Sequence, residues 1–283
     1  IDLWAEQITD YAKRYIKNSS NGIVLVGNSL GSVVALSAAT GDWSTETTTS
    51  QLSSSEQKKK QSVPPPLKNV RGLCLFNCGI GMNTRNFLKT IESKPTRVVV
   101  TAIFDLLDQL VFDNEALLTF AVTNFVSKDT LRNALVGLYS CADDPQSRVD
   151  DELVSSFVDP VLKDDPADVV DVIRQIYTND GGPTPMELHN QYPTILQSIP
   201  IHLIWGDQDN VTPLNGPVGK FYTGLANTNN DDESDSDDDN SNNGSATKKN
   251  NVSLQVINAG HIPFDERPEC NQGLVDWIQK SVL

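Results

Sequence analysis

Three polar residues stand where short apolar runs of the sequence end, and the first of them is a serine. Ser29 lies within Gly27-Asn28-Ser29-Leu30-Gly31, a G-x-S-x-G pattern between an apolar run and a helical pattern. A sharp strand-to-helix turn of this kind needs small neighbours, because larger side chains would clash, and it presents the serine hydroxyl as a nucleophile. The next backbone N–H, that of Leu30, then faces an oxyanion. The alternative is a serine that only caps the helix at a glycine-rich turn.

The second polar position offers an acid. Asp207 and Asp209 both follow the apolar run 201–205 through the glycine at position 206. Asp207 lies closer to the run, whereas Asp209 lies in the loop that can reach across to an imidazole and orient it. We therefore choose Asp209 as the acid and interpret Asp207 as a turn or cap residue.

The third position is a histidine, and the chain has three to choose from. His202 falls within an apolar run and His189 in a polar stretch, whereas His261 follows the last run through a glycine. A histidine in a loop is usually a surface residue. However, the chain order of Ser29, Asp209 and His261 is that of a nucleophile, an acid and a base placed at successive strand ends. The sequence therefore predicts a catalytic triad of these three residues.

The elements that must position these residues are visible as alternating patterns. Four near-continuous hydrophobic runs are typical of strands covered on both faces: 22–27, 70–76, 199–205 and 252–257. Helical spacing marks the start of the chain and three further segments: 29–39, 214–225 and 268–282. This order predicts an α/β fold with a mostly parallel sheet flanked by helices.

We expect three parts along the chain. Residues 1–81 and 199–283 supply the two halves of the sheet-containing core, and residues 82–198 form an inserted helical cap. The cap is predicted from five stretches of helical spacing: 96–112, 114–126, 128–140, 151–162 and 166–177. Its apolar faces either pack on the core or line a hydrophobic pocket.

Two segments lack any apolar periodicity. Residues 41–67 are rich in Ser, Thr, Lys and Pro, and residues 227–251 are rich in Asn, Asp and Ser. Neither can bury enough surface to offset its ordering entropy, so we predict two disordered insertions. The acidic cluster 231–239 lacks the glycine and the terminal glutamate of a calcium loop, and we interpret it as a solvated charge run.

Composition excludes several classes of protein. The 283 residues carry a net charge of −15, which argues against nucleic-acid binding because a phosphate backbone needs a basic face. The longest apolar stretch, 98–112, is broken by Asp105 and Asp108, so no transmembrane segment is expected. Four cysteines lack metal-ligand spacing and are predicted to be buried thiols: Cys74, Cys78, Cys141 and Cys270.

The sequence also carries a family resemblance. The motifs GNSLGS, WGDQDNVTP and AGHIPFDERPE resemble those of α/β-hydrolases with a cap domain, over nearly the whole chain. Within that superfamily, IDLWAEQI at the start, RGLCLFNCGIGMN at 71–83 and LNGPVGKFY at 214–222 look like the plastid group that includes pheophytinase and chlorophyll dephytylase. The resemblance implies an α/β-hydrolase fold, a serine hydrolase and a plastid location.

The resemblance is incomplete at the N-terminus. Chains of this fold normally begin with further strands, among them a loop that supplies a second oxyanion donor, and no such segment precedes Ile1. We therefore expect an N-terminally truncated chain whose first strands and targeting segment are missing. Only the N–H of Leu30 can then be assigned to the oxyanion hole.

The expected reaction is hydrolysis of a carboxylic ester. Ser29 attacks the carbonyl, His261 acts as general base, Asp209 holds its tautomer, and water releases the acyl group without a metal or organic cofactor. The expected substrate is a small hydrophobic ester, with a phytyl ester of a chlorophyll-type pigment as the candidate that the resemblance implies. Alternatives with the same triad are a cofactor-free haloperoxidase, a C–C hydrolase and a ligand receptor with slow turnover.

Overall fold

The computed structural model describes residues 1–16, 22–41, 67, 69–108, 112, 114, 116–120, 127–140, 142–163, 166–178, 180–227 and 251–283. The two predicted insertions, 41–67 and 227–251, fall almost entirely outside these ranges, as does Cys141.

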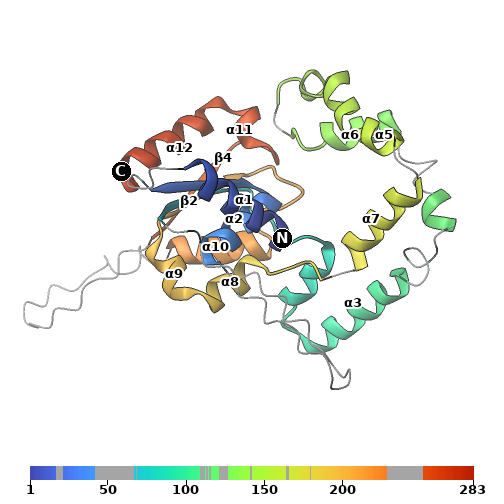
Figure 1. Cartoon of the computed structure of the whole chain (residues 1–283), viewed down its shortest axis with the longest axis horizontal. Helices are drawn as coiled ribbons and strands as arrows, with labels where there is room; N and C mark the ends of the chain where they lie inside the picture. The colour runs from blue at the N-terminus through green and yellow to red at the C-terminus, as the bar shows by residue number, and fades with distance from the viewer. Residues whose placement is uncertain are drawn as a thin grey trace, which may run out of the picture.

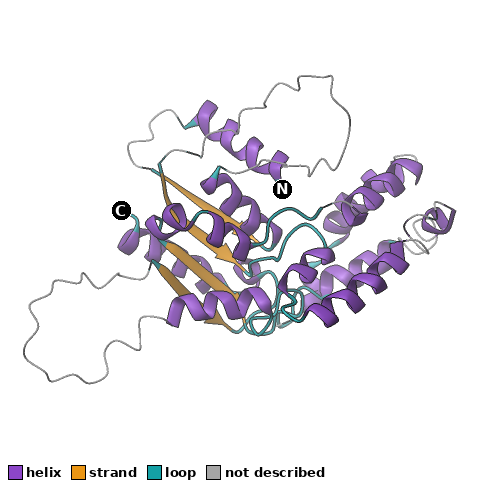
Figure 2. Ribbon diagram, turned by 90° about the horizontal axis from the view of Figure 1, so that it is seen from below, coloured by secondary structure: helices purple, strands orange, loops and turns teal. Residues whose placement is uncertain are grey.

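A four-stranded parallel sheet forms the centre of the described part of the chain. Its strands follow the order β1-β2-β3-β4 and comprise β1 (Ile23–Asn28), β2 (Val70–Phe76), β3 (Ile201–Gly206) and β4 (Val252–Ile257). The predicted strands 70–76 and 252–257 match the structure, and the other two are displaced by one or two residues. Because all four strands run in one direction, the loops after them gather at one edge of the sheet, on the side from which the helices of the segment between β2 and β3 project (Figure 2).

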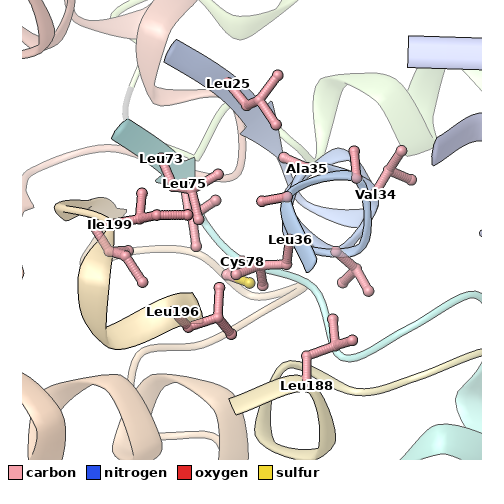
Figure 3. Packing of buried hydrophobic residues seen from close by; sticks show 14 of the residues in the cluster. Leu25, Val34, Ala35, Leu36, Leu73, Leu75, Cys78, Leu188, Leu196 and Ile199 are labelled. Atoms are coloured by element: carbon pink, nitrogen blue, oxygen red, sulfur yellow. The ribbon is translucent and has the colours of Figure 1, made fainter. Parts of the chain in front are cut away.

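The larger hydrophobic core covers one face of this sheet. At its centre is α2 (Leu30–Thr40), which buries nearly all of its side chains because small and branched apolar residues surround the whole helix. Figure 3 shows Val34, Ala35 and Leu36 of this helix among leucines from β1, β2 and the segment before β3. Four more helices pack in this layer: α1 (Asp2–Tyr15), α8 (Pro185–Gln191), α9 (Pro193–Ser198) and α10 (Pro217–Asn227).

The opposite face is covered by α11 (Pro263–Glu266) and α12 (Pro268–Ser281), drawn in red in Figure 1. Trp277 of α12 packs in a second cluster with Phe76 and Ile204. A Cβ at Gly72 of β2 would lie 2.8 Å from the Trp277 ring, so the close approach of this helix depends on glycine. Helices therefore cover both faces of the sheet, as its continuously apolar strands predict.

The remaining helices lie beside this core. They are η2 (Thr84–Thr90), α3 (Lys94–Leu107), α5 (Lys128–Val136), η4 (Pro145–Arg148), α6 (Asp151–Lys163) and α7 (Pro166–Thr178), and α3, α5, α6 and α7 form an arc in Figure 1. The chain is also helical over 116–120, the described part of the predicted helix 114–126. By contrast α8 and α9, which fall in the range predicted for the cap, pack against α2 in the core.

One helix of the segment between β2 and β3 ends earlier than its sequence pattern predicts. The spacing predicts a helix over 128–140, whereas α5 ends at Val136 and the chain turns through residues 137–140. The turn brings the carbonyl of Leu138 to within 2.9 Å of the backbone nitrogen of His261. The turn after α5 is thus linked to the loop that carries the predicted base.

Three described cysteines, Cys74, Cys78 and Cys270, are buried free thiols, as predicted. Burial raises the pKa of Cys78 to about 12, so this thiol is protonated at neutral pH. Within the described ranges, no helix combines the length and the apolar character needed to cross a bilayer.

Candidate active site

Ser29 occupies a strained turn directly after β1. Its backbone angles, φ 54° and ψ −120°, lie in a region that residues other than glycine rarely adopt. Its N–H donates to the carbonyl of Phe76 at 2.9 Å, and its own carbonyl accepts from the N–H groups of Ser32 and Gly79 at 3.0 Å each. The ends of β1 and β2 therefore hold the unusual conformation together, in the manner of a nucleophile elbow.

Glycines allow the tight packing of this turn, but not every glycine of the G-x-S-x-G motif is needed for it. A Cβ at Gly27 would lie 2.3 Å from the carbonyl oxygen of Gly31, and one at Gly79 would lie 3.0 Å from the nitrogen of Leu30. Gly27 therefore requires glycine, and Gly79 leaves little room for any side chain. At Gly31 an added Cβ meets no atom within 4 Å in the described part of the chain. The expectation that a larger side chain would clash is correct for Gly27 and wrong for Gly31, which projects away from the turn.

Leu30, the predicted oxyanion donor, is the first residue of α2. The N–H groups in the first turn of a helix have no carbonyl partner in a preceding turn, and the helix dipole is positive there. The backbone next to Ser29 thus has the polarity that favours a developing negative charge. The role of Leu30 as donor stays a prediction.

The predicted acid lies in a dense set of hydrogen bonds. Asp209 is only 3% exposed, whereas Asp207 is exposed. One carboxylate oxygen of Asp209 accepts from the backbone N–H groups of Val211 and Thr212, at 2.8 and 3.0 Å. The other lies 2.6 Å from Thr212 Oγ1 and 2.9 Å from His261 Nδ1. The structure therefore brings Asp209, and not Asp207, to His261.

These contacts determine the ionisation of Asp209. Burial by itself raises the pKa of this carboxyl group, but hydrogen bonds from His261 and Thr212 outweigh burial and hold the pKa below its usual value. Asp209 is therefore a carboxylate at neutral pH. It can only accept hydrogen bonds in this state, which places a proton on His261 Nδ1 and leaves the lone pair of the neutral ring on Nε2.

Contacts from two directions fix the loop that carries His261. The backbone N–H of His261 donates to Leu138 in the turn after α5, and the N–H of Gly260 donates to Glu266 Oε2 at 2.9 Å. A Cβ at Gly260 would lie 2.6 Å from the carbonyl oxygen of Leu138, so this approach of the two loops requires glycine. His261 itself is 7% exposed.

The other two histidines belong to the packed interior. His189 of α8 contacts the rings of Phe221 and Tyr222, and burial lowers its pKa to about 4. His202 of β3 stacks on Trp277, and burial lowers its pKa as well. Over the described ranges no group of three or more His, Cys, Asp or Glu side chains is placed to hold a metal ion.

Sequence reasoning missed two residues of this site. Thr212 contacts Asp209 through both its N–H and its hydroxyl, and Asn77 lies directly after β2 between the loops of Asp209 and His261. A polar residue at the end of a buried strand is the signal that could have identified Asn77. The same signal does identify Ser29 and Asp209.

The fold is similar to that of several solved structures, whereas the sequence identity to them is low. No protein-family model matches the sequence, and no curated protein matches it either. Among solved structures, a protein assigned as a lipase from Acinetobacter baumannii superposes with a TM-score of 0.50 and 15% sequence identity, over 98% of this chain and 68% of that one. A thermophilic esterase from Thermogutta terrifontis gives a TM-score of 0.47 and 15% identity, over 99% of this chain and 72% of that one. A bacterial membrane phospholipase A superposes with a TM-score of 0.47 and 16% sequence identity, over 98% of this chain and 63% of that one.

At these identities, structural likeness is informative about fold. The parallel sheet has helices on both faces, a sharp turn with a serine after β1, and a helical insertion between β2 and β3. Together with the likeness to the lipase, this architecture shows that the chain has the α/β-hydrolase fold.

Proposed function

We propose that this protein is a serine hydrolase that cleaves a hydrophobic carboxylic ester. The observation that carries the proposal is the hydrogen bond between Asp209 and His261, at the same edge of the sheet as the strained turn of Ser29. A buried carboxylate that orients an imidazole is the arrangement that activates a serine hydroxyl.

The loop after β2 supports the grouping of the three residues. Phe76 and Gly79 bond to the backbone of Ser29 on one side, and Asn77 between them bonds to the loops of Asp209 and His261 on the other. One short segment of chain therefore contacts Ser29 and the residues that lead to Asp209 and His261, namely Gly206 and Gly260.

In the proposed reaction, Ser29 Oγ attacks the ester carbonyl while His261 Nε2 accepts its proton. The Asp209 carboxylate stabilises the imidazolium, and the N–H of Leu30 donates to the oxyanion. His261 then gives the proton to the alcohol, which leaves. The acyl group remains on Ser29 as an acyl-enzyme. His261 then deprotonates a water molecule that attacks this ester, and collapse of the second intermediate releases the acid and restores Ser29.

Exposed apolar side chains on the cap favour a hydrophobic substrate. Helix α3 buries none of its residues, and Val98, Val99 and Ile103 are exposed by 68, 60 and 53%. Apolar surface that does not pack on the core can bind an alkyl chain, with a gain of about 0.8 kcal/mol per buried methylene. A long-chain alcohol is therefore the preferred leaving group. The phytyl ester of a chlorophyll-type pigment and a plastid location are the form of this proposal that the family resemblance favours.

Hydrolysis of a graded series of esters tests the proposal. The series runs from esters of short alcohols through long-chain alcohols to phytyl esters, including pheophytin, and kcat/KM is expected to rise with the length of the alcohol. Preference for short or charged esters would contradict the substrate class and leave the triad intact. A single turnover followed by a stable adduct would indicate a receptor instead of an enzyme.

The Ser29→Ala variant tests the nucleophile within the same assay. Loss of the nucleophile should reduce kcat by about 10³-fold or more, because the residual rate then comes from binding and oxyanion stabilisation alone. Retention of more than about a tenth of the activity would show that Ser29 is not the nucleophile.

A further inference from the structure

We infer that Asn77 is a positioning residue, whose carboxamide fixes the His261 loop relative to the Asp209 loop. The inference rests on the proposed function, because it assigns Asn77 a task within the proposed triad. Asn77 does not itself contact the reacting atoms in this account. It acts through the backbone on either side of it.

The side chain of Asn77 bridges two loops. Its Nδ2 donates to the carbonyl of Gly260, the residue before His261, at 2.9 Å. Its Oδ1 accepts from the N–H of Gly206, the last residue of β3, at 2.8 Å. The side chain is fully buried, so water does not compete for either bond. The partners also determine the orientation of the amide, because a carbonyl can only accept and an N–H can only donate.

The backbone of Asn77 makes two more contacts toward the same loops. Its N–H donates to the carbonyl of Ile204 at 3.1 Å, which extends the pairing of β2 with β3. Its carbonyl oxygen lies 3.0 Å from Thr212 Oγ1, the hydroxyl that also lies 2.6 Å from Asp209 Oδ2. A hydroxyl has one proton, so Thr212 donates mainly to the charged acceptor and Asn77 lies beside that pair.

Asparagine is the residue that meets all of these demands. The backbone at Asn77 has φ 42°, in the left-handed region that asparagine tolerates better than most residues. Glycine would keep this conformation and lose both side-chain bonds. Aspartate would keep the acceptor, but when ionised it would turn a second acceptor toward the carbonyl of Gly260.

These bonds fix the position of the His261 imidazole relative to the end of the sheet. Gly260 is held by Asn77 at its carbonyl and by Glu266 at its N–H, so the residue before His261 is fixed at both backbone groups. Without the amide, only one of these bonds remains. A displacement of about 1 Å between a base and its nucleophile reduces the rate by about 10²-fold, which sets the scale of the expected effect.

The first experiment compares Asn77→Gly with a matched control, Asn251→Gly. Asn251 lies before β4, at the opposite edge of the sheet, and its amide also clasps backbone carbonyls, those of Leu196 and Ile199. We expect Asn77→Gly to lower kcat for the ester substrate by about 10²-fold with KM changed less than about twofold. Both variants lose two side-chain hydrogen bonds and are expected to have similarly lowered melting temperatures. In Asn251→Gly, however, kcat should stay the same.

The second experiment is the pH profile of Asn77→Asp, which is nearly isosteric and keeps the left-handed backbone. At low pH its neutral carboxyl group can donate to Gly260, whereas on ionisation that donor is lost. Full burial at this position and the facing carbonyl of Gly260 disfavour the ionised carboxylate and raise its pKa toward the range in which a histidine base acts, so the profile should gain a falling limb on its alkaline side. The unsubstituted protein, with a histidine base, is expected to reach a plateau there. This readout survives even if Asn77→Gly fails to fold.

Reaction with an alkyl phosphonofluoridate separates failure of this inference from failure of the proposed function. If the unsubstituted protein neither reacts at Ser29 nor hydrolyses esters, both are overturned. If it reacts, and Asn77→Gly reacts at the same rate, or if Asn77→Asp shows a pH profile of unchanged shape, the positioning role of Asn77 alone is overturned.

Discussion

Asp209 Oδ2 lies 2.9 Å from His261 Nδ1, although 52 residues separate the two in the sequence. Adjacent parallel strands make this approach possible, since β3 and β4 end side by side and each loop begins at the same edge of the sheet. The carboxylate is held by Thr212 and the imidazole loop by Leu138, so both partners are oriented before any substrate binds. The proposed mechanism requires this preorganised pair to accept a proton from Ser29.

Substitution of the two neighbouring aspartates distinguishes their roles. Asp209→Asn should lower kcat by about 10⁴-fold, because an amide facing Nδ1 favours the wrong tautomer of His261. Asp207→Asn changes an exposed side chain, and its activity should stay within about twofold of the unsubstituted protein. Steady-state kinetics measure both variants. A larger loss of activity in Asp207→Asn than in Asp209→Asn would show that Asp209 is not the acid.

Thr212 should contribute to the ionised state of Asp209. Its hydrogen bonds help to hold the pKa of Asp209 below the unfolded value, so the ionised group stabilises the fold above about pH 3.9, and this contribution is lost as pH falls through the folded pKa. Thr212→Val removes the hydroxyl, so its deficit in unfolding free energy should be larger at pH 7 than at pH 2.5. Thr212→Ser is the control and should retain the pH dependence. A deficit of Thr212→Val that is equal at both pH values would show that the loss is one of packing alone.

His189 should make the fold sensitive to mild acid. Its folded pKa of about 4 lies below the unfolded value, so between about pH 6.5 and pH 4 the unfolded chain binds a proton that the folded protein does not. The free energy of unfolding should therefore decrease as the pH is lowered across this window, with a slope of up to about 1.4 kcal/mol per pH unit. His189→Phe retains an aromatic ring against Phe221 and Tyr222 and should reduce that slope. Parallel curves of unfolding free energy against pH for the two proteins would contradict the assignment.

The two glycines of the G-x-S-x-G motif should respond differently to alanine. At Gly27 the new methyl group would meet the carbonyl oxygen of Gly31, so unfolding free energy should fall by about 1–3 kcal/mol and the turn at Ser29 should be displaced. At Gly31 the methyl group meets no atom within 4 Å among the described residues. Gly31→Ala should therefore leave stability unchanged or raise it by up to about 1 kcal/mol, because alanine favours a helix. Denaturant unfolding of both variants measures the difference, and an equal loss at both positions would contradict the steric account.

Local patterns predicted much of this architecture. The strands 70–76 and 252–257 are visible in the sequence because each is a continuous apolar run with a clear end, and Ser29, Asp209 and His261 are visible because each follows such a run. The alternation predicted an α/β fold with a mostly parallel sheet, and the family resemblance implied the α/β-hydrolase fold; both are confirmed.

Features that depend on tertiary contacts were not predictable in this way. The role of Asn77 depends on β2 lying between β1 and β3, which no local pattern specifies. The end of α5 at Val136 depends on the approach of the His261 loop, and the packing of α8 and α9 on α2 depends on which face of each short helix meets the core. Helix α3 is apolar yet buries none of its residues, which hydrophobic spacing alone cannot distinguish from core packing.

The most direct test of the account is to map the site at which a phosphonofluoridate reacts. Attack by an activated serine on phosphorus expels fluoride and leaves a stable phosphonyl adduct, which peptide mass analysis can locate. The account predicts one adduct, on Ser29, formed about 10³-fold or more slowly in His261→Ala, because the serine is weakly nucleophilic without its base. No adduct on Ser29, or an adduct formed at an undiminished rate in His261→Ala, would contradict the claim that Asp209 and His261 activate this serine.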